Sequence, residues 1–220
     1  MKTPQLWAGF LRYPSLRDAP LSKTAAGWLR GRRLDDGYGA LWRVRDGLYD
    51  LDAFASRHPG GSQWLRVTRG TDITEAFVTS HLNPAVDVLL AKYHVRDVTT
   101  PRNSPYTFAH DGFYMTLKRN VWTFLKENVD DGRGVRSVDV QNGLLGVLAL
   151  SFALTVYWCE PVVAVVCGLL LAANVNCAHN FYHQRDSWRM YVWDLSLLSS
   201  FEWRITHALS HHGFTNTVLS

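Results

Sequence analysis

Two long stretches without charged residues limit what this chain can fold into. The first covers residues 141–158 and the second residues 162–180, with Glu160 and Pro161 between them. Eighteen helical residues span roughly 27 Å, close to the thickness of about 30 Å of membrane hydrocarbon. We therefore expect an all-α region with a helical hairpin that crosses a membrane twice and turns at Glu160-Pro161. A buried helical pair in a soluble protein is the alternative, because runs of this length are at the short end for spanning.

Charge is distributed unevenly along the 220 residues. Residues 1–39 carry seven basic and three acidic side chains, whereas residues 143–220 carry three and four. A basic N-terminal segment suits the anionic cytoplasmic leaflet of a membrane, although a solvated tail explains it equally well. The basic cluster at residues 30–33 has no nucleic-acid recognition motif beside it, so we expect no nucleic-acid partner.

Two histidines flank an apolar stretch near the middle of the first half. His58 begins the sequence His-Pro-Gly-Gly, and His81 follows 23 residues later. Two imidazoles on opposite walls of one slot can ligate a haem iron and leave it no open position, which favours electron transfer. Pro59 holds His58 in an extended conformation, and Gly60 and Gly61 permit a sharp turn close to a flat cofactor. A surface turn beside a chance histidine is the alternative.

The surrounding residues 41–98 resemble the cytochrome b5 haem-binding domain almost from end to end. The resemblance implies an α+β fold in which His58 and His81 are the axial ligands of non-covalent haem b, reduced by a cytochrome b5 reductase. We expect strands near residues 42–44 and 48–50, with short helices flanking each ligand. The matching motifs are Gly47-Leu48-Tyr49-Asp50-Leu51 before Phe54, the His-Pro-Gly-Gly sequence, Gly70-Thr71-Asp72-Ile73-Thr74-Glu75-Ala76-Phe77, His81 and Lys92-Tyr93.

Two further groups of histidines follow the second uncharged stretch. The first contains His179 and His183, and the second contains His207, His211 and His212. A spacing of four residues places two imidazoles on one face of a helix, with His212 about 100° around from His211. Clustered neutral imidazoles at a membrane boundary suit a transition metal. Relics of a lost site, or an interfacial surface, are the alternative.

These groups resemble the first two histidine boxes of the membrane-bound fatty-acid desaturases and hydroxylases. The resemblance implies non-haem iron that activates dioxygen against an acyl-CoA or acyl-lipid substrate, with electrons supplied by the upstream haem domain. The order of the parts is most similar to the insect-type cytochrome b5-related proteins and the front-end desaturases. Because that family needs a third box, five histidines are too few for its two-iron site. We therefore assign no catalytic residue and expect this chain alone to be inactive as a desaturase.

We divide the chain into four parts: a leader at 1–39, the haem domain at 40–97, a linker and amphipathic helix at 98–140, and a partial desaturase-like membrane domain at 141–220. Pro101 and Pro105 mark the linker. The helix, at residues 113–129, lies at a membrane surface or packs on the protein's own body. Its apolar face is expected to contain Phe113, Leu117, Val121, Phe124 and Leu125.

The two crossings return the chain to the side on which it began. No signal peptide is evident at the N-terminus, so we expect a multi-pass protein of the endoplasmic reticulum whose haem domain and histidine groups face the cytosol. Aromatic residues near the second crossing suit the membrane interface or ordinary core packing. These residues are Trp188, Tyr191, Trp193 and Trp203. The sequence also permits two other functions, a membrane-anchored electron carrier without desaturase activity and a non-enzymatic membrane interaction protein.

Overall fold

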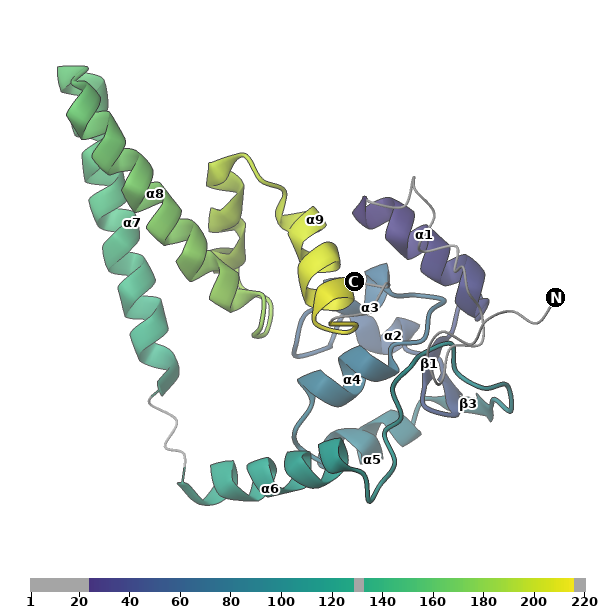
Figure 1. The fold of residues 1–220 in the computed structure, drawn as a ribbon. Coiled ribbons are helices and arrows are strands. Elements are labelled where there is room, and N and C mark those ends of the chain that lie inside the picture. Colours follow the sequence, from purple (N-terminus) through teal and green to yellow (C-terminus); the bar gives the residue numbers. More distant parts are fainter. Residues whose placement is uncertain (1–23, 129–132, 216–220) are drawn as a thin grey trace. The chain divides into compact units, whose positions relative to one another are not determined.

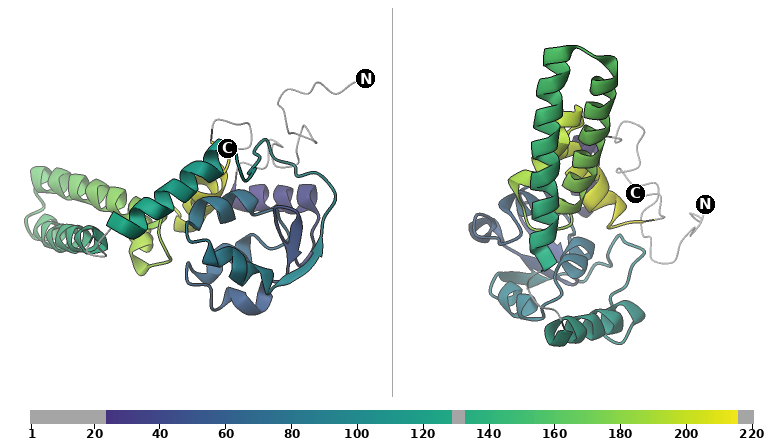
Figure 2. Two further views of the ribbon diagram at one scale, coloured as in Figure 1. Left: turned by 90° about the horizontal axis from the view of Figure 1, so that it is seen from below. Right: turned by 90° about the vertical axis from the view of Figure 1, so that its left-hand side faces the viewer.

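The computed structural model describes residues 24–128 and 133–215, with the side chains of residues 133–136 left out. These residues form two compact units (Figures 1 and 2). The first unit contains the described residues up to 128 together with those from 205 onward, and the second contains those from 133 to 204.

The first unit is built on a small antiparallel sheet. Strand β1 (Trp42–Val44) pairs with β2 (Gly47–Tyr49), and β2 pairs with β3 (His94–Asp97). The structure confirms the two predicted strands to within a residue. Strand β3 was not predicted, because its four residues are all exposed and show no pattern of alternating burial.

Five helices cover this sheet or flank the predicted ligands. The core combines Trp42 of β1 with Phe77 and Val78 of the fourth helix. The buried indole nitrogen of Trp42 donates a hydrogen bond of 2.9 Å to the carbonyl of Leu65, which satisfies its polar atom inside the core. The helices are α1 (Ala25–Asp36), α2 (Asp52–Ala55), α3 (Ser62–Val67), α4 (Thr74–Ser80) and α5 (Ala85–Ala91).

Helix α1 lies within the segment that we predicted as a leader. The Thr24 hydroxyl caps its first turn by accepting a bond of 3.1 Å from the Gly27 nitrogen. Gly37 ends the helix in the left-handed conformation, with φ of 70°. The Asp36 carboxylate accepts a bond of 2.8 Å from the Asp72 nitrogen, so this part of the leader is fixed to the haem-domain fold. The rest of the predicted leader, residues 1–23, lies outside the described residues.

The segment predicted as a linker contains no helix or strand between residues 98 and 112. Its Arg102 nevertheless forms ion pairs with the buried carboxylates of Asp72, at 2.7 Å, and Glu75. Buried Ser104 also donates to Glu75. Beyond this segment, helix α6 (Phe113–Asn128) forms where the amphipathic helix was predicted, over the residues that the structure describes. Of its predicted apolar face, Leu125 is half-buried and the other four residues are exposed.

The second unit is a helical hairpin with a short cap. Helices α7 (Arg133–Trp158) and α8 (Pro161–Phe181) run side by side in opposite directions (Figures 1 and 2). The predicted turn is present, because Glu160 is the N-cap of α8 and Pro161 is its first residue. The cap contains the 3₁₀-helix η3 (Trp188–Ser196) and α9 (Ser200–Trp203). The chain then continues as the π-helix η4 (Arg204–His211), which crosses from the second unit into the first.

Few residues of the hairpin are buried. The stretches Ser137–Trp158 and Pro161–Phe181 are long and apolar enough to cross a membrane, and only 11% of the most apolar window of each is buried. A helix pair in the core of a soluble protein would be mostly buried, so these exposed apolar surfaces favour lipid as their surroundings. The two helices are joined by Asn174, which is fully buried and donates to the Leu144 carbonyl at 3.1 Å.

The aromatic residues that follow α8 divide into two groups. Trp188 and Tyr191 are exposed, as the prediction of an interfacial position requires. Trp193 is buried and stacks on Trp203, with ring centroids 4.3 Å apart, so this pair fits the alternative of core packing.

Candidate haem and metal sites

The two predicted haem ligands face each other across the first unit. His58 lies in the loop between α2 and α3, and His81 is the residue directly after α4. Their ring centroids are 6.1 Å apart. Two imidazoles on opposite sides of one metal, each with a metal–nitrogen bond of about 2 Å, would have centroids about 6 Å apart. The observed separation therefore fits a shared iron.

Backbone carbonyls fix the orientation of both imidazoles. The Nδ1 atom of His58 lies 2.8 Å from the Gly61 oxygen, and that of His81 lies 2.9 Å from the Phe77 oxygen. A carbonyl can only accept, so each Nδ1 carries the hydrogen and each Nε2 is left with a lone pair for a metal. These two hydrogen bonds to backbone carbonyls set the tautomer that ligation requires.

The glycines of the His-Pro-Gly-Gly motif provide space for the His58 ring. A Cβ atom built on Gly60 would lie 2.9 Å from Cε1 of His58, closer than real Cβ contacts come. Gly61 has φ of 116°, a conformation that side-chain-bearing residues rarely adopt. We predicted that both glycines permit a sharp turn. The structure shows that the missing side chain at Gly60 also leaves room for the ring of His58.

The walls of this site are apolar and aromatic. Phe54 contacts His58 edge-on with centroids 5.8 Å apart, and Phe77 lies 4.9 Å from His81. Burial lowers the pKa of His81; the carbonyl of Phe77 opposes this effect, and nearby His58 and Lys118 add to it. A lowered pKa favours the neutral imidazole, which is the form that binds iron. The donor set, its tautomers and its apolar walls all fit a bis-histidine haem.

Two contacts from α6 to this site were not predicted. Met115 packs against the haem-domain core, and the Lys118 ammonium donates to the Val78 carbonyl at 2.8 Å, three residues before His81. No local pattern near His81 indicates these contacts, because they join segments about 40 residues apart. The structure shows both Met115 and Lys118 half-buried, a property that their positions in the sequence do not reveal.

The first histidine group belongs to the second unit. His179 lies in the last turn of α8, whereas His183 follows the end of the helix at Phe181. Their rings still lie close together, with centroids 5.0 Å apart. The predicted proximity is therefore present, but a turn rather than a continuous helix face brings the rings together.

The second histidine group differs from its predicted geometry. Helix η4 has π-helical hydrogen bonding, in which the His212 nitrogen donates to the His207 carbonyl at 3.0 Å. A repeat of five residues aligns His207 with His212, whose Nε2 atoms are 2.9 Å apart. We expected His207 and His211 to share one helix face, with His212 about 100° around from His211; in the structure His212 also contacts His207 directly. His211 still stacks on His207, with centroids 5.5 Å apart.

The segment that carries this second group packs against the haem-domain fold. Ile205 and Leu209 form a buried cluster with Ala25 and Leu29 of α1, and Trp64 of α3 packs against it. Phe214 completes the contact, because the Arg32 guanidinium lies 5.0 Å from its ring centroid. Local sequence patterns could not predict this contact, which joins residues about 180 positions apart.

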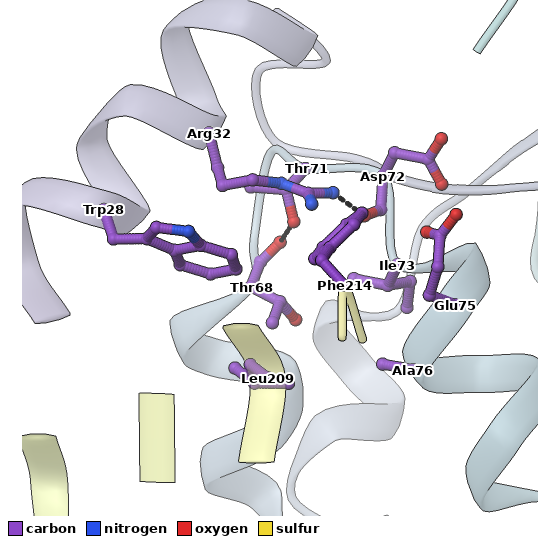
Figure 3. A pocket seen from close by; sticks show the side chains of 10 residues that line it. All are labelled: Trp28, Arg32, Thr68, Thr71, Asp72, Ile73, Glu75, Ala76, Leu209 and Phe214. Carbon is purple, nitrogen blue, oxygen red and sulfur yellow. Dashed lines mark hydrogen bonds between the residues drawn. The ribbon is translucent and has the colours of Figure 1, made fainter. Parts of the chain in front are cut away.

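A small cavity lies within this contact (Figure 3). Its volume of about 20 Å³ is enough for one water molecule and too small for an acyl chain. Arg32 points into the same region and donates to the Asp72 carbonyl, as the dashed line in Figure 3 shows. The cavity is therefore a packing feature of the contact. It is lined by Trp28, Arg32, Thr68, Thr71, Asp72, Ile73, Glu75, Ala76, Leu209 and Phe214.

Comparisons with known proteins match this arrangement. Residues 32–99 fit the family model of the cytochrome b5-like heme/steroid binding domain. A cytochrome b5-related protein of Drosophila melanogaster is 39% identical over 206 residues, which cover 94% of this chain and 47% of that protein. A cytochrome b5-related protein of Drosophila virilis is 44% identical over 134 residues, which cover 60% of this chain and 91% of that protein.

More distant similarity extends to desaturases. An acyl-lipid (8-3)-desaturase of Mortierella alpina is 26% identical over 191 residues, which cover 79% of this chain and 43% of the enzyme. The chain thus spans about half the length of the Drosophila melanogaster relative and of this desaturase. No solved structure matches the chain. Of the two ligands named for the matched domain, the facing histidines favour haem over a steroid.

Proposed function

The chain belongs to the cytochrome b5-related proteins, and we propose that its haem domain passes electrons from a cytochrome b5 reductase to a desaturase-like non-haem iron centre acting on acyl lipids. One observation carries the proposal: the segment with His207, His211 and His212 packs on the haem-domain fold through Ile205 and Leu209. Electron transfer needs a donor and an acceptor held near each other. Packing of this kind would hold a metal on the second histidine group close to the haem domain through each redox cycle.

His58 and His81 are the proposed axial ligands of haem b. When bound, the haem supplies a one-electron carrier, and ligation on both faces leaves the iron no position for dioxygen. The chain's own residues set this chemistry. The carbonyls of Gly61 and Phe77 orient the two imidazoles, and Phe54 contacts the His58 ring edge-on.

The remaining five predicted ligands are proposed to hold non-haem iron. Imidazole nitrogens suit this metal. Within each histidine group, neighbouring ring centroids lie 5.5 Å apart or less. The Nε2 atoms of His207 and His212 already lie 2.9 Å apart, which places two donor atoms where one ion can meet both. Acyl-CoA or acyl-lipid substrates are proposed by analogy with the desaturases. The proposed ligands are His179, His183, His207, His211 and His212.

The two candidate spans and the desaturase relatives indicate a membrane protein. We propose a multi-pass protein of the endoplasmic reticulum in which the hairpin of α7 and α8 returns the chain to the cytosolic side. The haem domain at residues 40–97 would then face the cytosol. The desaturase-like residues 141–220 would face the cytosol as well, except for the hairpin, which lies in the membrane. Tags at Met1 and Ser220 should be accessible from the cytosol, and a tag at Glu160 should be protected.

A membrane-anchored electron carrier without desaturase activity is the second candidate. The observation that favours it is that the haem site has both its ligands and their carbonyl partners within one compact unit. Such a protein would need only the hairpin as an anchor. The two functions differ in whether the five other histidines bind iron.

Metal analysis tests the proposal. The full 220-residue chain, purified from membranes, should contain about one haem and less than two non-haem irons. A longer natural form of the protein that carries a third histidine box should gain both non-haem iron and acyl desaturation. Replacing His207 and His212 with Ala should lower non-haem iron and leave the haem spectrum unchanged. Haem without any non-haem iron in the longer form would overturn the desaturase proposal and leave the electron carrier.

A further inference from the structure

Helix α6 has two faces with different surroundings. Four residues at helical spacing, Met115, Lys118, Trp122 and Leu125, are half-buried. A second set contains large apolar side chains that are exposed, and its centre lies about a third of a turn from the centre of the first set. The exposed fractions are 83% for Phe113, 46% for Leu117, 36% for Val121 and 61% for Phe124. We call the first set the inner face and the second set the outer face.

The inner face is occupied by the haem domain. Met115 packs against the core cluster that contains Phe77 and Val78, and Lys118 donates to the Val78 carbonyl at 2.8 Å. Phe108, just before the helix, packs on the same cluster and contacts Tyr114 edge-on at 5.6 Å. These contacts fix the rotation of α6 about its axis, so the outer face is held away from the haem-domain core.

The outer face is thus an apolar stripe that the described residues of the first unit, 24–128 and 205–215, leave exposed. A single exposed Leu or Phe is ordinary on a protein surface, but four in a row along one face of a 16-residue helix form a patch that favours a partner. For α6 we predicted either a position at a membrane surface or packing on the protein's own body. The two faces allow both at once. The inner face packs on the protein, and the outer face is left for another surface.

The chain itself indicates which surface this is. Helix α6 ends at Asn128, and the candidate span Ser137–Trp158 begins nine residues later. Arg133, the first residue of α7, is only five positions after Asn128, so their Cα atoms can be at most roughly 17 Å apart even at full extension. The end of α6 is therefore tethered close to the point at which the chain enters the bilayer.

The charged residues on the rest of α6 also suit a membrane surface. Arg119 and Lys126 lie on the helix away from the stripe, and Glu127 is the one acidic residue of α6. An apolar stripe with basic residues on the polar face is typical of helices that lie in the plane of a membrane surface, and anionic lipids strengthen their binding. Tyr114, half-exposed at the edge of the stripe, is of the type enriched at that boundary.

We propose that α6 lies in the plane of the lipid surface, with its outer face in the headgroup region and its inner face holding the haem domain. The helix then acts as a strap that presents the haem domain to the membrane with the His81 side of the site nearest to α6. This inference rests on the membrane hairpin of the proposed function, but it does not depend on electron transfer or on non-haem iron.

Site-directed spin labelling of the full chain in vesicles of zwitterionic and anionic phospholipid tests the proposal. The three native cysteines, at 159, 167 and 177, are replaced by Ala, and one label at a time is attached to a new cysteine. The outer-face positions are Leu117 and Phe124. Thr116 and Thr123, which are exposed on the polar side of the same helix, are matched controls. Leu169, 67% exposed in α8, reports on the hairpin.

The expected result is a contrast between adjacent residues. Labels at Leu117 and Phe124 should be relaxed more by oxygen than by a water-soluble nickel complex, and labels at Thr116 and Thr123 should show the reverse. Equal access of the nickel complex to all four positions would overturn the proposal. Exclusion of both reagents from Leu117 and Phe124 would also overturn it and would identify a protein, such as a second copy of this chain, as the occupant.

The label at Leu169 tests the membrane hairpin separately from the position of α6 at the lipid surface. If Leu169 shows the lipid signature and the α6 positions do not, the hairpin stands and the strap fails. If Leu169 is accessible to the nickel complex, the membrane hairpin fails and the strap fails with it.

Discussion

The haem ligands and the second histidine group illustrate two ways of bringing imidazoles together. His58 and His81 come from separate segments, and each ring is oriented by a carbonyl close by in its own segment. His207 and His212 come from one short helix, and their Nε2 atoms lie 2.9 Å apart because that helix has a five-residue repeat. The first site is prepared by side-chain packing and the second by backbone hydrogen bonding. The two sites should therefore respond differently to substitution.

The largest expected effect is the loss of a haem ligand. Replacing His58 or His81 with Ala removes one of the two axial nitrogens, so the low-spin bis-histidine spectrum should be lost and an open iron position should appear. Absorption and electron paramagnetic resonance spectra of the full chain measure this change. His94 is the matched control, because it is partly exposed and pairs with Asp97 at 2.8 Å away from the ligand pair. A low-spin spectrum that survives in both ligand variants would show that the assignment is wrong.

A smaller effect is expected from the glycine beside the first ligand. The Gly60→Ala change adds a Cβ atom 2.9 Å from the His58 ring, so the ring or the loop must shift. Disturbing the shell around a metal ligand typically costs about 10–100-fold in affinity, and we expect haem dissociation to accelerate within that range. Haem transfer to apomyoglobin measures the rate. Gly146→Ala, where nothing lies within 4 Å of the new atom, should leave the rate unchanged.

Iron binding by the second histidine group should depend on the five-residue backbone register that aligns His207 with His212. Deleting one residue between His207 and His212 would place them four residues apart and remove the five-residue alignment. Deleting Ala208 should therefore lower iron binding about as much as replacing His212 with Ala, as measured by mass spectrometry of the bound metal. Retention of full iron binding by the deletion variant, together with loss in the His212 variant, would show that the π-helical alignment is not required.

The contact between the second group and the haem domain can be weakened without touching either site. Leu209 is 8% exposed, and truncating a buried Leu to Ala typically costs about 2–5 kcal/mol. Leu209→Ala should therefore increase hydrogen exchange in residues 205–215 while the haem spectrum stays the same. Leu195, 55% exposed, is the control, and its replacement by Ala should leave exchange in residues 205–215 at the wild-type level.

How much of this could be read from the sequence depends on how local each signal is. The strands at residues 42–44 and 47–49, the haem ligands and the hairpin turn at Pro161 follow from short patterns or from familiar motifs. The strand at residues 94–97 did not, because its exposed side chains carry no periodic signal. The π-helix at His207 could not be predicted either, since an α-helix and a π-helix use the same residues and differ only in hydrogen-bond register.

Long-range contacts account for the rest. Arg102 stands in a segment with two prolines that predicts a linker, yet it is 13% exposed and pairs with two buried carboxylates. Helix α1 lies in the predicted leader and packs against Leu209, about 180 residues away. Nothing in a local pattern identifies the partner of a charged or apolar side chain at such distances.

The smallest predicted effect concerns Lys118, a positive charge that belongs to α6 and acts on the haem site. Its ammonium is held 2.8 Å from the Val78 carbonyl, at the end of the helix that leads to His81. A positive charge favours the reduced iron because reduction lowers the positive charge of the site. Lys118→Gln should therefore lower the reduction potential, by an amount equivalent to about 1 kcal/mol or less, since a half-exposed charge is screened by water and salt. Potentiometric titration of the full chain measures the shift.

Lys126 is exposed near the end of the same helix and provides the control, because Lys126→Gln should leave the potential unchanged. Equal shifts in the two variants would show a general effect of net charge, whereas a shift confined to Lys118 would show that α6 tunes the haem as well as packing beside it.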